Sequence, residues 1–194
     1  MKNLKTWIKG IKVLLWIALI GFGITLINTT GALISSSDMV ANVYLKNTKT
    51  TTLSKAVLNV NAGVLSFRSK HVLDKLLFKH IYGYHDFMQS LFTFVVCCLL
   101  LFALNKLNPD HPFNPDVAKH ITWLGLLYVF YGVITIFAAL YMASRIETLS
   151  HEVTGAYTTF RDDFSNIKIG IFVLILSVIY RAGITFQEEN RLTI

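Results

Sequence analysis

The sequence predicts an all-α membrane protein: a four-transmembrane-helix bundle with a small extracytoplasmic cap between helices one and two. The main observation is a run of 25 residues, Val13–Ser37, that contains no Asp, Glu, Lys, Arg or His. Because a helix rises about 1.5 Å per residue, roughly 20 apolar residues cross a hydrocarbon core of about 30 Å. Three further apolar windows follow, at Phe87–Asn105, Ile121–Ser144 and Ile167–Phe186.

Composition supports this fold class and limits the domain count. The chain is 54% hydrophobic and 15% charged, whereas soluble domains carry about 25% charged residues. Its 194 residues hold one integral membrane domain, 1–194. The net charge is +7, but the cations are scattered through loops and helix ends without forming a basic arm. We therefore interpret them as flanking charges at the headgroups and expect no direct nucleic-acid binding.

The four helices are expected over about 11–33, 86–104, 116–145 and 167–186. Trp7 and Trp16 suit a headgroup belt beside the first helix. A cleaved signal peptide is the competing interpretation of the first window. Lys2, Lys5, Lys9 and Lys12 would form its basic region, and Thr30-Gly31-Ala32 its cleavage site.

The cap is expected over 35–86. Its first half alternates and is rich in β-branched residues, and Asn61-Ala62-Gly63 is a plausible hairpin turn between strands at 56–60 and 64–67. Its second half, 71–82, has helical spacing and predicts an interfacial amphipathic helix. Its expected apolar face is Val72, Leu73, Leu76, Leu77 and His80, and its expected polar face is Lys70, Asp74, Lys75 and Lys79.

The connection before the third helix, 105–119, contains all three prolines of the chain. Proline fixes φ and restrains the residue before it, so this connection is stiff. Asn114 is a good N-cap, Pro115 suits the first helical position and Asp116 suits the first turn. These residues predict the start of the third helix.

Orientation depends on the basic residues. With the N-terminus inside, eight Lys and Arg lie inside and ten outside, so the plain count does not support this orientation. We still prefer it, because four lysines within twelve residues adjoin the first helix, which usually dominates. An even number of helices then places both termini in the cytoplasm.

The sequence predicts neither catalytic nor metal-binding residues and no cofactor. The six histidines form no His-x-x-x-His or Glu-x-x-His pair inside an apolar window, and carboxylate pairs are missing there too. Cys97 and Cys98 are adjacent, and neighbours on a helix point about 100° apart. We interpret them as small apolar residues of the bundle and do not expect an enzyme.

Two intramembrane polar residues are candidates for a structural or functional role. Arg181 lies 13 residues after Lys168, about 20 Å along a helix, and so inside or at the edge of the hydrocarbon. It either pairs with a carboxylate or a helix-end carbonyl, or snorkels to the headgroups. Asn28 shares a stripe with Gly21 and Thr25, which favours helix packing over a substrate path that would also include Tyr128.

Two segments carry a resemblance to a known family. The first is Pro112-Phe113-Asn114-Pro115-Asp116, followed by Ile121 and Gly125. The second is Tyr180-Arg181-Ala182-Gly183-Ile184, followed by Phe186-Gln187-Glu188-Glu189-Asn190-Arg191-Leu192-Thr193-Ile194. Together they resemble the start of the third helix and the closing signature of "domain of unknown function 2975", a family of small bacterial membrane proteins. The resemblance covers roughly 85–194, and Arg191 stands where the family usually has Asp.

The resemblance also implies a partner and a location. Members of this family are commonly encoded beside a small helix-turn-helix repressor, which implies a bacterial cytoplasmic membrane protein that holds a cytosolic regulator or senses through it. The expected partner-binding residues are Gln187, Glu188, Glu189, Asn190, Arg191, Leu192 and Ile194, with Pro112, Phe113, Asn114 and Pro115 at the start of the third helix. The alternative is a small oligomeric transport or channel subunit, and a homo-oligomer is possible in either case.

Overall fold

The computed structural model describes residues 2–35, 39–45, 49–53, 56–60, 63–69, 72–77, 87–107, 113–149 and 164–192. Four helices in these ranges are long and apolar enough to cross a bilayer: Lys5–Ile34, Phe87–Lys106, Pro115–Tyr141 and Ser165–Glu189. This confirms the predicted bundle of four apolar helices. The chain is a multi-pass membrane protein.

Each long helix extends beyond its apolar window. The helices are α1 (Lys2–Ser35), the short α2 (Val72–Leu77), α3 (Phe87–Lys106), α4 (Pro115–Leu149) and α5 (Ser165–Leu192). The strands are β1 (Met39–Leu45), β2 (Lys49–Leu53), β3 (Ala56–Val60) and β4 (Gly63–Ser69). The long helices continue into polar sequence because no proline interrupts them after the first helical position of α4.

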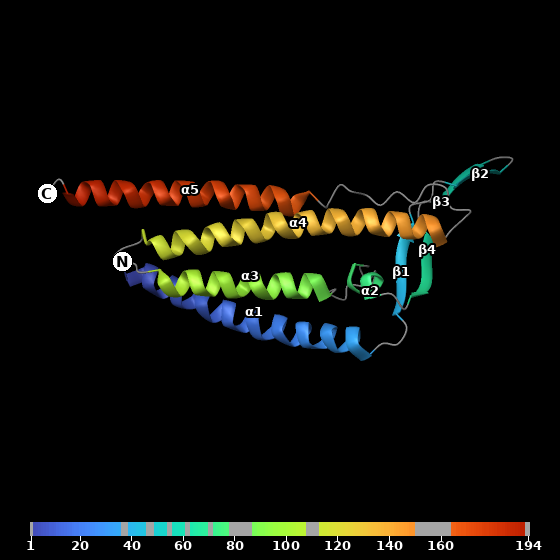
Figure 1. The fold of residues 1–194 in the computed structure, drawn as a ribbon, viewed down its shortest axis with the longest axis horizontal. Helices are drawn as coiled ribbons and strands as arrows, with labels where there is room; N and C mark the ends of the chain where they lie inside the picture. The colour runs from blue at the N-terminus through green and yellow to red at the C-terminus, as the bar shows by residue number, and fades with distance from the viewer. Residues whose placement is uncertain are drawn as a thin grey trace.

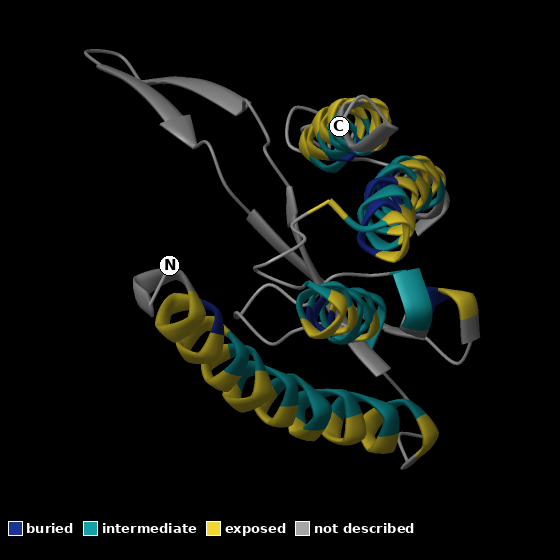
Figure 2. Ribbon diagram, turned by 90° about the vertical axis from the view of Figure 1, so that its left-hand side faces the viewer, coloured by how far each residue is buried: buried dark blue, intermediate teal, exposed yellow. Residues whose placement is uncertain are grey.

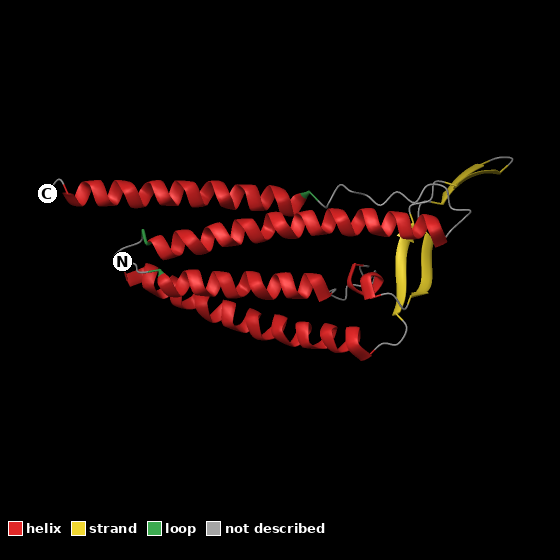
Figure 3. Cartoon of the chain, in the orientation of Figure 1, coloured by secondary structure: helices red, strands yellow, loops and turns green. Residues whose placement is uncertain are grey.

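The four long helices run side by side with alternating direction (Figure 1). Lys2 of α1, Lys106 of α3, Pro115 of α4 and Leu192 of α5 all lie at one end, which we call the terminal end. Helix α2 and the four strands lie at the opposite end (Figure 3). Viewed along the bundle, α1 packs against α3, α3 against α4, and α4 against α5 (Figure 2).

Helices α4 and α5 approach most closely where glycines face each other. A Cβ atom built on Gly170 would lie 2.7 Å from the backbone nitrogen of Val129 and 2.8 Å from the carbonyl oxygen of Gly125. A Cβ on Gly125 would lie 2.8 Å from Leu174, and one on Gly132 would clash with Ile167. Small residues let two membrane helices meet backbone to backbone. Gly125, Gly132 and Gly170 therefore allow the close contact between α4 and α5.

The pairing of the strands differs from the predicted hairpin. Strand β4 pairs antiparallel with β1, and β3 pairs antiparallel with β2. The turn predicted through Asn61-Ala62-Gly63 therefore does not join two paired strands. The sequence pattern identified strand-forming segments, but their partners depend on register across the whole segment, which alternation alone does not specify.

The predicted amphipathic helix is rotated over the residues that the structure describes. Helix α2 spans six residues, Val72–Leu77, and 78–82 lie outside the described residues. Asp74, placed on the polar face by the sequence, is fully buried at 0% exposure, whereas Leu73 is 56% exposed. The phenol of Tyr141 on α4 donates a hydrogen bond of 2.6 Å to the Asp74 carboxylate. A buried carboxylate needs such donors, and a tertiary partner of this kind cannot be read from helical periodicity.

Gly21 and Asn28, which the sequence interprets as helix-packing residues together with Thr25, do not face another described helix of this chain. A Cβ on Gly21 would meet nothing within 4 Å, and Asn28 is exposed. The glycine of α1 that faces α3 is Gly23, whose added Cβ would lie 3.6 Å from the ring of Phe94. The inner face of α1 is therefore the one that carries Gly23.

Candidate partner-binding end of the bundle

The terminal end begins with a well-formed helix cap. The side-chain oxygen of Asn114 accepts a 2.9 Å hydrogen bond from the backbone N–H of Asp116, and its carbonyl accepts the first helical bond from Ala118 at 3.2 Å. Pro115 occupies the first helical position, where no N–H is needed. The structure thus shows the capping arrangement that the sequence predicts for Asn114, Pro115 and Asp116.

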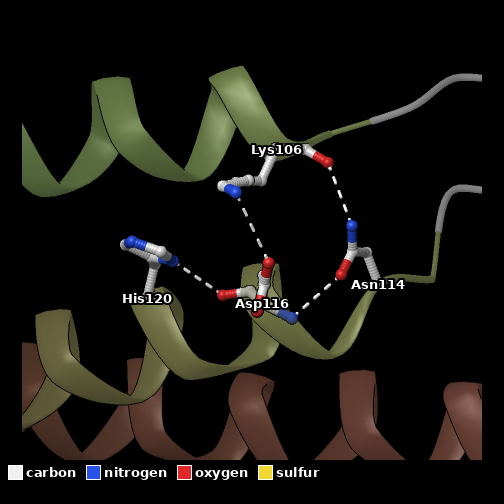
Figure 4. A network of polar contacts seen from close by, with 4 residues as sticks. All are labelled: Lys106, Asn114, Asp116 and His120. Atoms are coloured by element: carbon white, nitrogen blue, oxygen red, sulfur yellow. Dashed lines mark hydrogen bonds and ion pairs between the residues drawn. The ribbon is translucent and has the colours of Figure 1, made fainter.

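The same cap joins α4 to the last turn of α3 (Figure 4). The amide nitrogen of Asn114 donates to the carbonyl of Lys106 at 3.2 Å. The Lys106 ammonium lies 3.6 Å from the Asp116 carboxylate, with both side chains 58% exposed. His120 contacts the backbone oxygen of Asp116 through Nδ1 at 2.6 Å. An exposed ion pair contributes little stability, so the bond from Asn114 to the Lys106 carbonyl is the main polar link between these helices among the described residues.

The two sequence segments that carried the family resemblance pack against each other. The backbone N–H of Asn114 donates to the phenol oxygen of Tyr180 at 3.1 Å, and the rings of Phe113 and Tyr180 lie 5.4 Å apart. A Cβ on Gly183 would clash with the Phe113 ring. Gly183 therefore leaves the space that Phe113 occupies, and the start of α4 is held by α5. Pro112 lies outside the described residues.

A second polar cluster lies deeper between α4 and α5. The hydroxyl oxygens of Thr122 and Ser177 lie 2.6 Å apart, and both contact the Ala118 carbonyl, at 2.9 Å from Thr122 and 3.3 Å from Ser177. Arg181 donates from Nη2 to the Thr122 oxygen at 3.2 Å. Ser177 is only 2% exposed. The Thr122 hydroxyl thus contacts every other member of the cluster.

Arg181 is hydrogen-bonded to a residue that the sequence did not propose as its partner. Its hydrogen bond to Thr122 involves neither a carboxylate nor a helix-end carbonyl. Side chains on a helix lean toward its N-terminus, and in α5 that direction leads away from the terminal end. The guanidinium therefore reaches Thr122 of α4, and the residue remains exposed.

The last part of α5 projects past the other helices at the terminal end (Figure 1). Gly183 contacts Phe113, just before α4 begins, and α5 continues for nine residues to Leu192, about 13 Å. Glu188 and Glu189 are exposed, and the side-chain oxygen of Gln187 is buried without a hydrogen-bond partner among the described residues. For Asn190, Arg191 and Leu192 only the helical backbone is described, and Ile194 lies outside the described residues.

The structure therefore brings Phe113, Asn114, Pro115 and Arg181 together at one end, with Gln187, Glu188 and Glu189 just beyond them. Asn28 belongs elsewhere, at an exposed position of α1. Sequence analysis missed Thr122 as the partner of Arg181 and Tyr180 as the partner of Asn114. Tyr180 stood in the quoted signature, but Thr122 carried no signal, because a single threonine in an apolar window is ordinary.

Within the described ranges, no three His, Cys, Asp or Glu residues gather as a metal site would require.

Comparison with known proteins gives a family. A family model with the description "Protein of unknown function (DUF2975)" matches residues 83–194, which is more than half of the chain and includes α3, α4 and α5. Neither curated proteins nor solved structures gave a match. Helix α1 and the four strands precede the matched segment. The chain therefore belongs to the DUF2975 family.

Proposed function

We propose that the protein is a non-enzymatic bacterial membrane protein whose terminal end binds a cytosolic helix-turn-helix regulator. The supporting observation is the projecting part of α5, 184–192, which extends beyond the first residue of α4 and presents Glu188 and Glu189 to solvent. A helix that leaves the bundle adds little to packing within it. It offers an acidic, helical docking segment of the kind that a basic regulator can bind.

The α3–α4 connection would form the second part of the binding surface. Phe113 is 40% exposed while packing against Tyr180 and Gly183. The Asn114 cap fixes this connection to both α3 and α5. Binding of a partner to the projecting segment would therefore change the contacts at the start of α4. Conversely, changes in the bundle would make the membrane protein hold or release the regulator.

The test is co-purification from native membranes of a small basic DNA-binding protein with a helix-turn-helix sequence. Charge reversal of both exposed acids, Glu188→Lys with Glu189→Lys, should abolish its recovery. Leu73→Lys, at an exposed position of α2 at the opposite end, is the matched control and should retain it. Recovery that is unchanged by the double reversal would refute docking on this segment.

The transport alternative would be supported by a polar cavity between the helices. One cavity among the described residues, between α2, α3 and α4, measures about 20 Å³, enough for about one water molecule. Most of its lining is apolar, including Leu76, Leu77, Met88, Ile134 and Ala138. This cavity gives transport no support, so we retain the regulator-binding proposal.

A further inference from the structure

The outer face of α1 has a regular pattern that the bundle does not use. Seven residues follow alternating steps of four and three, and all seven are exposed: Gly10, Leu14, Ile17, Gly21, Ile24, Asn28 and Gly31. We call this set the α1 outer stripe. Added Cβ atoms on its three glycines would meet nothing within 4 Å. The contact with α3 lies on the other side of the helix, where Ile8 is buried and Gly23 approaches Phe94.

This spacing is the one by which two helices wind around each other. A repeat of alternating four and three residues averages 3.5, which keeps one seam facing a partner helix in a left-handed supercoil. Glycines in the seam allow close approach in a membrane, where burial of apolar surface from water does not drive association. The stripe therefore has the geometry of a helix–helix seam in addition to being apolar.

Asn28 supplies an independent reason for a protein partner. It lies 15 residues after Val13 and seven before Ser35 in the charge-free run, so it is about 10 Å from the far end of α1 and inside the hydrocarbon. Its amide forms no side-chain hydrogen bond with another described residue. An amide left without partners in hydrocarbon is costly, and lipid acyl chains offer neither donors nor acceptors.

We infer that the α1 outer stripe binds the α1 outer stripe of a second copy of this chain. All copies insert with the same orientation, so the two α1 helices run parallel and a two-fold axis places Asn28 opposite Asn28. An amide carries both a donor and an acceptor, so two Asn28 side chains satisfy each other across such an axis. A different protein would need a polar residue at this same depth.

The charges of α1 are compatible with this parallel dimer. At about 100° per residue, Lys5, Lys9 and Lys12 lie about 100° or more around the helix from the stripe. They therefore do not face their copies across the seam. The inference concerns α1, which precedes the family match, and does not depend on regulator binding at the other helices.

Cysteine cross-linking in native membranes tests the seam directly. In a full-length background with Cys97→Ala and Cys98→Ala, Ile24→Cys on the stripe should form an oxidised dimer. Trp16→Cys is the control, because Trp16 is 52% exposed yet lies about 100° or more around the helix from the neighbouring stripe residues Leu14 and Ile17. Equal cross-linking at both positions, or cross-linking at neither, would overturn the inference.

A second measurement tests the role of Asn28. Energy transfer between labelled full-length copies in lipid vesicles reports dimerisation, and Asn28→Leu should weaken it about 5- to 30-fold, the range measured for polar contacts between model membrane helices. Asn28→Gln, which keeps donor and acceptor, should retain most of it, as should Ile27→Leu. If the dimer were as strong with Asn28→Leu as with the native residue, the amide would not contribute to the seam, which would contradict the inference.

Discussion

The hydroxyl of Thr122 makes three polar contacts with a single proton and two lone pairs. It donates to the Ala118 carbonyl and can then accept from both Ser177 and Arg181. All its hydrogen-bonding capacity is used, which matters inside a bilayer, where water cannot replace a lost partner. Arg181 therefore stabilises the α4–α5 contact through a neutral acceptor, and its removal leaves no uncompensated charge on α4.

A double-mutant cycle measures this contact. Arg181→Leu removes the donor and Thr122→Val removes the acceptor at nearly constant shape. We expect a coupling energy of about 0.6 kcal/mol and below about 1.7 kcal/mol, as for hydrogen bonds between other membrane helices. Unfolding in detergent micelles by a mild denaturant gives the four values. A coupling of zero would mean that Arg181 only snorkels, as the second interpretation from the sequence proposed.

Asn114 gives a second residue-scale prediction. Asn114→Ala removes the cap of α4 and the bond to Lys106 together, so the free energy of unfolding should fall by about 1–2 kcal/mol. Asn114→Asp is the control, because it keeps the capping oxygen and loses only the donor to Lys106, and its loss should be smaller. Equal losses in the two variants would show that the cap itself contributes nothing.

At the scale of the elements, the contact between α4 and α5 depends on positions without side chains. Gly125, Gly132 and Gly170 lie at the crossing, and the nearest atoms to an added Cβ on Gly170 include backbone. Backbone cannot rotate away as a side chain can. The distance between these helices is therefore set by glycine, and the hydrogen bonds of Thr122 and Ser177 form at that distance.

Gly170→Ala should thus force the helices apart and lower stability by about 1–3 kcal/mol, the usual cost of overpacking. Ala182→Leu, at an exposed position of the same helix, adds more atoms and should change stability little. Thermal unfolding of both variants in the same detergent makes the comparison. If Ala182→Leu were the more destabilising, the proposed close contact would not determine the helix spacing.

The sequence predicted the elements better than their partners. Charge-free length identifies a membrane helix because the bilayer imposes it, and the Asn114-Pro115-Asp116 cap depends on neighbours in the chain. Asp74 was misplaced because its partner, Tyr141, is 67 residues away. The Arg181 contact with Thr122 was missed for the same reason, since it joins two helices whose relative rotation no local pattern determines. The pairing of β1 with β4 likewise depends on a connection longer than a hairpin.

At the scale of the whole molecule, one end gathers the two termini and the family signature, while α2 and the strands lie at the other (Figures 1 and 3). Because the four long helices alternate in direction, the two termini share a side of the membrane. The lysines before Val13 predict that this side is the cytoplasm. A regulator that binds DNA can reach the projecting segment of α5 only in this orientation.

Labelling of single cysteines checks the orientation. Cysteines placed at Asn3 and Thr193, in the background without Cys97 and Cys98, should resist an impermeant reagent applied to the outside of intact cells. Both should label once the membrane is opened, which controls for reactivity. Ready labelling of either position in intact cells would place the terminal end outside and exclude a cytosolic partner.

Deletion of Gln187–Ile194 tests regulator binding at the projecting segment most directly. The deletion leaves the apolar stretch of α5 to Phe186 and the contacts of Ser177, Tyr180 and Gly183 in place, so the shortened chain should insert and unfold like the full one. In matched detergent, the full chain should retain a small helix-turn-helix protein from its own cytosol and the shortened chain should lose it. Identical retention by both, with equal stability, would contradict the proposed function.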